Sequence, residues 1–341
     1  MKSIPTISVV VPLHNEEANV AELLKRTLTV LDSMPGGPHE LVLVDDGSVD
    51  RTLEMIEKAA ETDPRIVVVV LSRNFGHQAA LGAALDVASG DAVVMMDGDL
   101  QDAPEYIPEF AEELQRGYDV VYAERVKRKE STLWRYCYRG FYWLITELSD
   151  VAMPQEVGDF GMMSRRVVDI LRSSPERHLY WRGLRSWAGF RQKGIPVERD
   201  ARHAGKSKYS LRKLLQLAFD GIFSFSIVPL RAASFCGALA IVLSVGFSAY
   251  SVFAKVFLAR TPRGFTALFV GITFLTGIQL LFLGIIGEYV GRIYEQVKLR
   301  PRYIVSRIIG QKWTQPTRAD TEISTKDIGG GVPERPISLP L

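Results

Sequence analysis

Short apolar runs recur along the first third of the chain, and each has the length of a β-strand. They are Ile7 to Leu13, Glu40 to Val44, Ile66 to Leu71, Ala92 to Met96 and Asp119 to Ala123. Between these runs, apolar residues recur three and four positions apart, which is the spacing of amphipathic helices. Strands that are apolar on both faces and alternate with helices predict an α/β fold, with a mostly parallel sheet covered by helices on each side.

Polar segments follow four of the five expected strands. In chain order they read PLHNEE, DDGSVD, SRNFGHQAAL and DGDLQD. Ligands of open parallel sheets bind beyond the carboxyl ends of the strands, so these four segments are expected to converge on one crevice.

Two long apolar stretches occupy the second half, and we expect spanning helices at 232–258 and 266–291. Lys255 is the one charge in the first stretch, and Ala267 to Ile286 carries none. Each can cross a hydrocarbon layer of about 30 Å as a helix. The short link ARTPRGFT predicts a hairpin, and the Lys and Arg residues outside it predict that both chain ends are cytosolic. A buried core hairpin is the alternative.

Two further segments have the character of membrane-surface helices. The segment 131–148 is aromatic along one face and carries Arg135 and Arg139 elsewhere, and 211–231 leads into the first apolar stretch. For the first segment, a core helix with a solvated basic edge is the alternative. Residues 292–341 are expected to form a cytosolic tail that is disordered after about Gly310.

Composition and charge narrow the class of protein. The chain of 341 residues is 47% hydrophobic and 23% charged, which is ordinary for a folded protein. A formal net charge of +2 does not argue for a nucleic-acid partner. Cys137 and Cys236 fit neither a disulfide framework nor a metal cluster, so both are expected to be reduced. The N-terminus lacks the pattern of a signal peptide, and the first domain is expected in the cytosol.

The run VVMMDGDLQDAPE places Asp97, Asp99 and Gln101 directly after a strand. In an extended segment these alternate side chains would project to one side and present hard oxygens to one point. The pattern therefore favours a Mg²⁺ or Mn²⁺ site with positions left for a substrate phosphate. The alternative is an acidic turn that caps the next helix.

The run VDDGSVDRT follows the second strand, where carboxylates can accept hydrogen bonds from a base or a ribose. The chain has neither a G-x-G-x-x-G fingerprint after its first strand nor a P-loop, so carboxylates and metal are expected to bind a nucleotide. Arg73 is a candidate for contact with a diphosphate. We interpret three histidines as loop or core residues: His14, His77 and His203.

The combination of motifs resembles a known family. It includes VVVPLHNEE, VDDGSVDRT, RNFGHQAALGAAL, MDGDLQDAPE, GDFGMMSRRVV, RHAGKSKYS and DGIFSFSIVPLR. Together they resemble family 2 glycosyltransferases of the GT-A fold, specifically polyprenyl-phosphate glycosyltransferases similar to dolichol-phosphate mannosyltransferase and bacterial undecaprenyl-phosphate glucosyltransferases. The resemblance runs from about Ile7 to Arg307, and implies a GT-A catalytic domain at 1–210.

The resemblance also implies roles for individual residues. The nucleoside pocket would be lined by Pro12, Asn15, Glu16, Asp45 and Asp46, and which of the two aspartates touches the base stays open. Metal and donor diphosphate would be held by Asp97, Asp99 and Gln101, with Asp97 also touching the nucleotide and Asp99 also catalytic. Asp159 would act at the reacting centre, and the phosphates would be enclosed by Arg202, Ser207 and Lys208.

The implied reaction is metal-dependent, inverting transfer of one sugar from a nucleotide-sugar to polyprenyl phosphate at the cytosolic face of the inner membrane. UDP-glucose is favoured as donor over GDP-mannose or another UDP-sugar. Arg135 and Arg139 are candidates for the lipid phosphate, or for anionic headgroups. A homo-oligomer would form through the spanning helices, where Gly287 and Gly291 make a small-xxx-small pair.

Two other functions remain open at this stage. A processive polysaccharide synthase would use the same donor chemistry with a sugar acceptor, but RGLRSWAGF matches its Q-x-x-R-W motif only in part. A non-catalytic membrane scaffold would retain the nucleotide fold and tolerate loss of Asp97 or Asp99.

Overall fold

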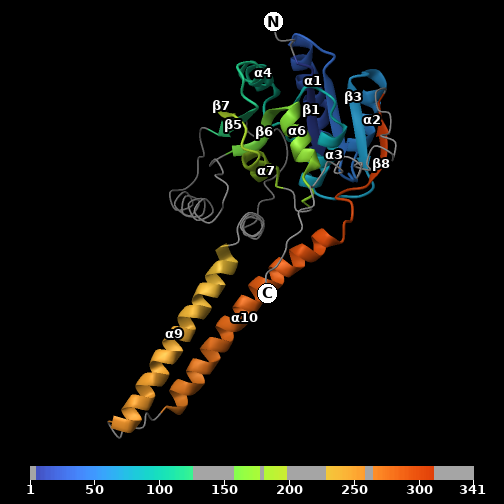
Figure 1. The fold of residues 1–341 in the computed structure, drawn as a ribbon. Coiled ribbons are helices and arrows are strands. Elements are labelled where there is room, and N and C mark those ends of the chain that lie inside the picture. The colour runs from blue at the N-terminus through green and yellow to red at the C-terminus, as the bar shows by residue number, and fades with distance from the viewer. Residues whose placement is uncertain (1–4, 126–156, 177–179, 198–227, 258–263, 311–341) are drawn as a thin grey trace, which may run out of the picture.

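The computed structural model describes residues 5–125, 157–176, 180–197, 228–257 and 264–310 (Figure 1). Within these ranges the chain forms a sheet domain and two long helices that lead away from it. The expected surface helix at 131–148, nearly all of the one at 211–231, and the tail beyond 310 lie outside the described residues.

The described strands form one eight-stranded sheet in the order β7-β5-β6-β4-β1-β2-β3-β8. Their bounds are β1 (Ile7–Leu13), β2 (Glu40–Asp45), β3 (Ile66–Leu71), β4 (Ala92–Met95), β5 (Val120–Arg125), β6 (Val157–Ser164), β7 (Gln192–Val197) and β8 (Val305–Ile309). All five strands expected from the apolar runs are confirmed, with small shifts at their ends.

The sheet is mixed, so the expectation of a mostly parallel sheet holds only in part. The pairs β1–β2, β1–β4, β2–β3 and β5–β7 are parallel. The pairs β4–β6, β5–β6 and β3–β8 are antiparallel. Because β6 runs opposite to β4, the first residues of β6 lie at the carboxyl end of β4, beside the expected site.

Helices cover both faces of the sheet. One face carries α1 (Glu17–Ser33), α2 (Thr52–Thr62), the short 3₁₀ helix η1 (Pro104–Tyr106) and α4 (Ile107–Gln115). The other carries α3 (His77–Val87), α6 (Arg165–Ser173) and α7 (Trp181–Trp187). Successive strand residues alternate between the two cores, as Val9 and Val11 face one and Val10 the other.

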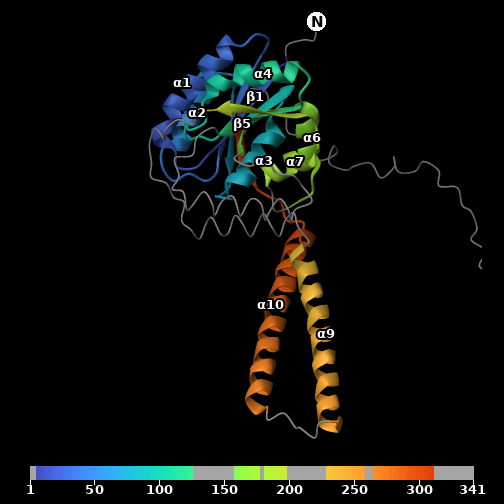
Figure 2. The same ribbon diagram turned by 90° about the vertical axis from the view of Figure 1, so that its left-hand side faces the viewer.

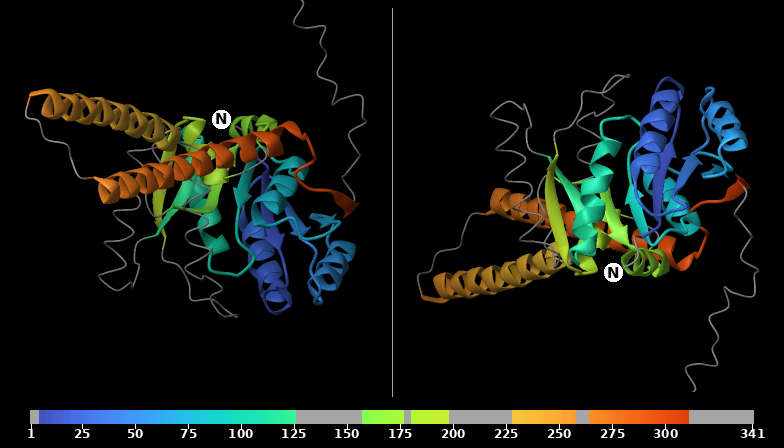
Figure 3. Two further views of the ribbon diagram at one scale, coloured as in Figure 1. Left: turned by 90° about the horizontal axis from the view of Figure 1, so that it is seen from below. Right: turned by 90° about the horizontal axis from the view of Figure 1, so that it is seen from above.

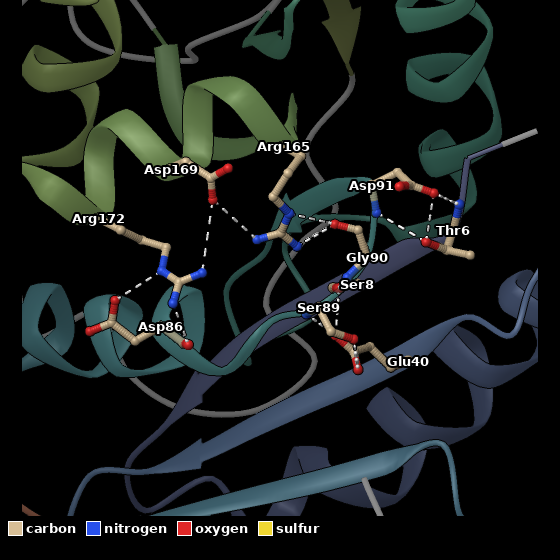
Figure 4. Close-up of polar contacts among 10 residues, drawn as sticks. All are labelled: Thr6, Ser8, Glu40, Asp86, Ser89, Gly90, Asp91, Arg165, Asp169 and Arg172. Atoms are coloured by element: carbon tan, nitrogen blue, oxygen red, sulfur yellow. Dashed lines mark hydrogen bonds and ion pairs between the residues drawn. The ribbon is translucent and has the colours of Figure 1, made fainter. Parts of the chain in front are cut away.

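A closed set of hydrogen bonds fixes the start of β4 against β1 and β2, and we call Ser8, Glu40, Ser89 and Gly90 the amino-end network (Figure 4). Ser8 Oγ donates to Glu40 Oε1 at 2.6 Å and accepts from Gly90 N at 2.7 Å. Ser89 donates its N–H to Glu40 Oε1 at 2.6 Å and its hydroxyl to Oε2 at 2.9 Å. A Cβ on Gly90 would lie 2.7 Å from Ser8 Oγ, so only glycine fits there.

The two long helices are α9 (Val228–Phe257) and α10 (Phe265–Val297), and they run side by side away from the sheet domain (Figures 1 and 2). Large apolar side chains on both are exposed, including Val242 at 67% and Leu281 at 63%. Among the described residues, one segment, Phe274–Val297, is long and apolar enough to cross a membrane, and α9 contributes a shorter apolar segment, Ala233–Phe247. Both expected helices are present, whereas one membrane span is supported instead of two.

After α10 the chain returns to the sheet, which the sequence did not predict. Strand β8, the red arrow in Figure 3, lies at the edge of the sheet. It pairs antiparallel with β3, with Val69 opposite Ile308 and Val70 opposite Arg307. Residues 292–310 are therefore not an irregular tail, since α10 extends to Val297 and β8 forms the edge of the sheet.

Candidate active site

The loops after β1 and β2 are tied together by side-chain hydrogen bonds. Asn15 has a left-handed backbone (φ 57°), its N–H donates to Ser48 Oγ at 3.1 Å, and its Oδ1 accepts from Val49 N at 2.8 Å. Glu16 N donates to Thr52 Oγ1 at 2.8 Å. The two polar loops therefore form one surface at the carboxyl ends of these strands.

Two consecutive buried aspartates end β2, and they have different partners. Both oxygens of Asp45 lie 3.3 Å from Ser48 N, within its own loop. Asp46 reaches the next loop, where Oδ1 accepts from Phe75 N at 2.7 Å and Oδ2 from Gly76 N at 2.9 Å. Burial raises the pKa of Asp46, although these two backbone donors oppose the rise. Asp46 thus fixes the loop that starts α3.

The residues expected to line the nucleoside pocket all lie at the adjoining ends of β1 and β2: Pro12, Asn15, Glu16, Asp45 and Asp46. Their role in binding stays a prediction.

His77 begins α3 and lies between two carboxylates. Its Nε2 is 3.5 Å from Asp97 Oδ1 and 3.6 Å from Asp159 Oδ2. Burial lowers the pKa of His77, but the hydrogen bond to Asp159 and the charges of both aspartates outweigh burial, so the pKa is raised overall. The interpretation of His77 as a loop or core histidine missed this contact.

The register of β4 and β6 explains why Asp97 and Asp159 meet. Met95 pairs with Gly161 in this antiparallel ladder. Each step forward along β4 is matched by a step back along β6, so two steps beyond this pair place Asp97 opposite Asp159. Residues 62 positions apart are thereby brought to one end of the sheet.

A buried ion pair holds Asp159 in place. Arg182 Nε donates to Asp159 Oδ1 at 2.8 Å, and Nη2 donates to Oδ2 at 3.2 Å. Gln78 Nε2 lies 3.5 Å from Oδ2, and Gln78 Oε1 accepts from Trp181 N at 3.2 Å. Burial alone would raise the pKa of Asp159, but Arg182 and then His77 hold it well below the usual range of a carboxyl. Asp159 is therefore ionised at neutral pH.

The acidic loop after β4 does not follow the extended path that we expected. Leu100 has φ 58° and is buried in the core, so the chain turns between Asp97 and Gln101. Asp99 Oδ1 accepts from Gln101 N at 3.1 Å, which closes the turn. The expectation of three side chains alternating on one side of a straight segment is wrong, because the buried Leu100 pulls the backbone inward.

Asp97 has an oxygen that is suited to a cation. Its Oδ1 is buried and accepts no hydrogen bond within the described residues, although His77 Nε2 lies 3.5 Å from it. Burial raises the pKa of Asp97, the charge of His77 opposes this rise, and the charges of Asp159 and Asp99 add to it. No three His, Cys, Asp or Glu side chains in the described ranges gather to hold a metal ion by themselves. The residues present fit a cation that takes its remaining ligands from substrate oxygens, as Mg²⁺ commonly does.

Several expected site residues fall outside the described residues, namely Arg135, Arg139, Arg202, His203, Ser207 and Lys208. Two other residues considered from the sequence, Arg73 and His14, lie within the described ranges. Arg73 packs its guanidinium 4.1 Å from the Phe75 ring and donates to Asn74 O at 3.0 Å. His14 Nδ1 lies 2.9 Å from Asp46 O.

Sequence reasoning missed the contacts that His77, Gln78 and Arg182 make with Asp159. His77 was visible as the first polar residue of an expected helix after the third strand, so its position beyond a carboxyl end was the available signal. Arg182 lies in the segment RGLRSWAGF, whose partial match to the Q-x-x-R-W motif of synthases gave no reason to place it beside Asp159. We define His77, Asp97, Asp159 and Arg182 as the carboxyl-end site.

Comparison with known proteins gives the family. Residues 8–171 match the family model described as Glycosyl transferase family 2. The chain is 42% identical to the uncharacterized glycosyltransferase YkcC of Bacillus subtilis, covering 89% of this chain and 94% of that protein. It is 40% identical to the SfII prophage-derived bactoprenol glucosyl transferase of Shigella flexneri, covering 88% of this chain and 97% of that one. It is 36% identical to the undecaprenyl-phosphate 4-deoxy-4-formamido-L-arabinose transferase of Edwardsiella ictaluri, covering 90% and 95%. With its α/β sheet and such relatives along nearly its whole length, the chain belongs to glycosyl transferase family 2 and is a glycosyltransferase.

Proposed function

We propose that the enzyme transfers one sugar from a nucleotide-sugar to polyprenyl phosphate, with inversion at the anomeric carbon. The observation that carries this proposal is the carboxyl-end site. There Asp97, whose buried Oδ1 accepts no hydrogen bond within the described residues, lies opposite the ionised Asp159. Two relatives that align with almost the whole chain are named for transfer to bactoprenol or undecaprenyl phosphate, which supports the same acceptor here.

In this proposal the donor lies over the ends of β1, β2 and β4. The nucleoside would contact the tied loops of Asn15 and Asp45, and the diphosphate would lie at Asp97 and Asp99. A bound Mg²⁺ or Mn²⁺ would neutralise the charge that develops on the leaving nucleoside diphosphate. The buried oxygen of Asp97, which accepts no hydrogen bond within the described residues, supports a cation at this position, and Gln101 would complete the loop that holds it.

Asp159 is proposed to position charge and not to remove a proton. Its ion pair with Arg182 keeps its pKa far below neutrality, so it would be a poor general base. The acceptor phosphate does not require a base, because phosphate monoesters have a second pKa near 6 and are largely ionised at neutral pH. A fixed carboxylate beside the sugar instead stabilises the positive charge of an oxocarbenium-like transition state.

The acceptor explains the attached helices. An isoprenoid chain stays in lipid while its phosphate is reached from the water side, and α10 supplies a segment that can cross the bilayer. We propose an inner-membrane protein whose catalytic domain and two termini are cytosolic, with α9 and α10 as a spanning hairpin. The return of β8 to the sheet supports the same side for the catalytic domain and the residues after α10. Arg135 and Arg139 stay candidates for the lipid phosphate, Arg202, Ser207 and Lys208 for the donor phosphates, and the spanning helices for contact in a homo-oligomer.

Glucose is the favoured sugar, because a relative at 40% identity is named a bactoprenol glucosyl transferase. The relative named for a formamido-arabinose shows that relatives of this kind differ in the sugar they carry. Pocket shape at the donor selects among such sugars, so the sugar must be determined by experiment.

The test is transfer of labelled sugar into lipid extract by the purified full-length protein. UDP-glucose, UDP-N-acetylglucosamine, UDP-formamido-arabinose and GDP-mannose are each offered with undecaprenyl phosphate, with Mg²⁺, Mn²⁺ or EDTA. We expect one donor, UDP-glucose, to give a lipid product bearing a single sugar, and only with a metal.

Other products would contradict the proposal in recognisable ways. A water-insoluble polymer would identify a processive synthase. Absence of product from every donor, with nucleotide binding intact and the protein folded, would favour a scaffold. The paired variants Asp97→Ala and Asp99→Ala separate the cases, since a scaffold tolerates both and the enzyme loses activity with either.

A further inference from the structure

The chain after α10 is fastened to the sheet domain at several points. We call Gln296 to Ile309 the return strap. Its last part, β8, adds an edge strand beside β3, and Ser72 N donates to Ile304 O at 2.9 Å. The strap therefore fixes the sheet-proximal end of α10 to the catalytic domain by backbone hydrogen bonds.

One side chain of the return strap, Tyr303, contacts the C-terminal end of α3. Tyr303 packs against the core on the α3 side of the sheet, and its hydroxyl donates to Asp86 Oδ2. Arg172 of α6 holds the same aspartate, with Nε 3.2 Å from Oδ1 and Nη2 2.9 Å from the backbone oxygen (Figure 4). Asp86 therefore connects α3 to both the return strap and α6.

Two more contacts fasten the strap to the segment that follows α6. Arg302 Nη2 donates to Ser174 O, and Gln296 Nε2 donates to Pro175 O at 2.7 Å. Gln296 lies in the last turn of α10, so this helix is fixed to the domain before the chain enters β8.

The helices gripped by the strap also build the carboxyl-end site. Helix α3 begins with His77, which faces Asp97 and Asp159, and Asp86 lies nine residues along the same helix, about 14 Å away at 1.5 Å per residue. Helix α6 follows directly on β6, the strand that carries Asp159. The strap is thus fastened to the same elements that carry the site, and these contacts set how the end of α10 is placed relative to the site.

We propose that Arg302 and Tyr303 are positioning residues for the transfer reaction, which fix the catalytic domain on α10 so that the phosphate of a lipid-embedded acceptor reaches Asp159. This inference rests on the proposed function. The donor arrives from solution and needs no such alignment, but a long isoprenoid acceptor is confined to the bilayer in which α10 is held. Misplacement by about 1 Å can cost on the order of 100-fold in rate, so the mounting of the domain matters for this acceptor alone.

The test compares two acceptors in the full-length protein reconstituted in lipid nanodiscs. The variant Arg302→Met/Tyr303→Phe removes the two donors and keeps most of the apolar bulk. Arg65→Met is the control, because it also replaces a bonded guanidinium by an apolar chain, here one paired with Asp63 at 2.7 Å and with Asp32, at the opposite end of the sheet. Transfer is measured to undecaprenyl phosphate in the bilayer and to a short, water-soluble isoprenyl phosphate.

We expect the strap variant to lose about tenfold in kcat/KM with the bilayer acceptor and to stay within about twofold of wild type with the soluble one. The control should keep the wild-type ratio between the two acceptors. Equal losses with both acceptors, or no loss with either, would overturn the proposal.

A distance measurement tests the mount without any turnover. Spin labels are placed at the exposed positions Glu61 on α2 and Val290 on α10, in a background that lacks both native cysteines. The wild-type strap should give a narrow distance distribution in nanodiscs, and the strap variant a broadened one. An unchanged distribution in the variant would overturn the mount. If the wild type transferred sugar to neither acceptor, the proposed function would fail, and with it the positioning role, while the distances would still report on the mount.

Discussion

Two carboxylates at opposite ends of the central strands differ in their hydrogen bonds: Glu40 is buried, whereas the Asp97 side chain is 28% exposed with its Oδ1 buried. At the amino end, Glu40 accepts three hydrogen bonds from Ser8 and Ser89, and Figure 4 shows the network closed by Gly90. At the carboxyl end, Asp97 has an oxygen with no hydrogen-bond partner among the described residues.

This difference distinguishes a carboxylate that stabilises the fold from one that is suited to binding a ligand. A buried charge whose hydrogen bonds are satisfied within the protein holds strands in register. A buried carboxylate oxygen that accepts no hydrogen bond costs stability, and such an oxygen is available to a ligand. By this criterion Glu40 belongs to the fold, and Asp97 fits its proposed role toward the donor and its cation.

The largest expected effect comes from Asp97→Asn. Transfer should fall by about 1,000-fold, because the variant loses the anionic oxygen that faces the leaving group. Burial raises the pKa of Asp97, so the charged form is disfavoured in the fold, and the neutral amide should leave the unfolding temperature unchanged or raised. Transfer assays and thermal unfolding of the same preparation check both parts. A variant that keeps its activity would remove Asp97 from the reaction.

Arg182→Met should damage both stability and activity. It removes the guanidinium that pairs with the buried Asp159 and leaves His77 and Gln78 beside the carboxylate. Breaking a buried ion pair typically costs about 3–5 kcal/mol. The pKa of Asp159 is lowered in the fold, so its ion pair stabilises the protein above the unfolded pKa near 4, and this contribution is lost as the pH falls. The stability gap between wild type and variant should therefore be widest at neutral pH and shrink toward about pH 3. A pH-independent gap in thermal unfolding would contradict the assigned charge state.

A smaller effect is expected from His77→Gln. The amide keeps a hydrogen-bond donor near Asp97 and Asp159 but removes the imidazole whose pKa these two carboxylates raise. We expect kcat to fall about tenfold with the donor KM little changed, since the arrangement of the two carboxylates is disturbed but both remain. Steady-state kinetics with saturating acceptor measure the split. A normal kcat would assign His77 to the fold alone.

The smallest effect on transfer should come from Glu40→Gln at the amino end. The amide still accepts from Ser8 but presents a donor toward Ser89, so unfolding should become easier by about 1 kcal/mol. Activity per folded molecule should equal that of wild type. A loss of activity without a loss of stability would erase the distinction between the two ends.

Local pattern was enough to predict much of the sheet. The runs that became β1 to β5 are apolar on both faces, and their burial on two sides made them recognisable. Strand β8 escaped because three of its five residues are exposed, it contains Arg307, and its partner β3 is distant in the chain. The bend at Leu100 was equally hidden, since one buried side chain decided the path of an otherwise polar loop.

The sequence predicted the site residues that belong to a single recognisable motif. It missed those that reach the site only through strand pairing and helix packing. Asp97, Asp99 and Asp159 were chosen from their motifs, and the structure places Asp97 opposite Asp159. His77 and Arg182 reach the same point from other elements, and only the pairing of β4 with β6 and the packing of α7 reveal it. The spacing of residues along the sequence does not predict contacts of this kind between distant elements.

The most direct test of an open carboxyl end is the binding of Mn²⁺ together with UDP, followed by electron paramagnetic resonance of the full-length protein. Wild type should bind the ion with UDP present, Glu40→Gln should bind it equally well, and Asp97→Asn should bind it at least about tenfold more weakly. Equal binding by Asp97→Asn and wild type would contradict the assignment of Asp97 to the donor's cation.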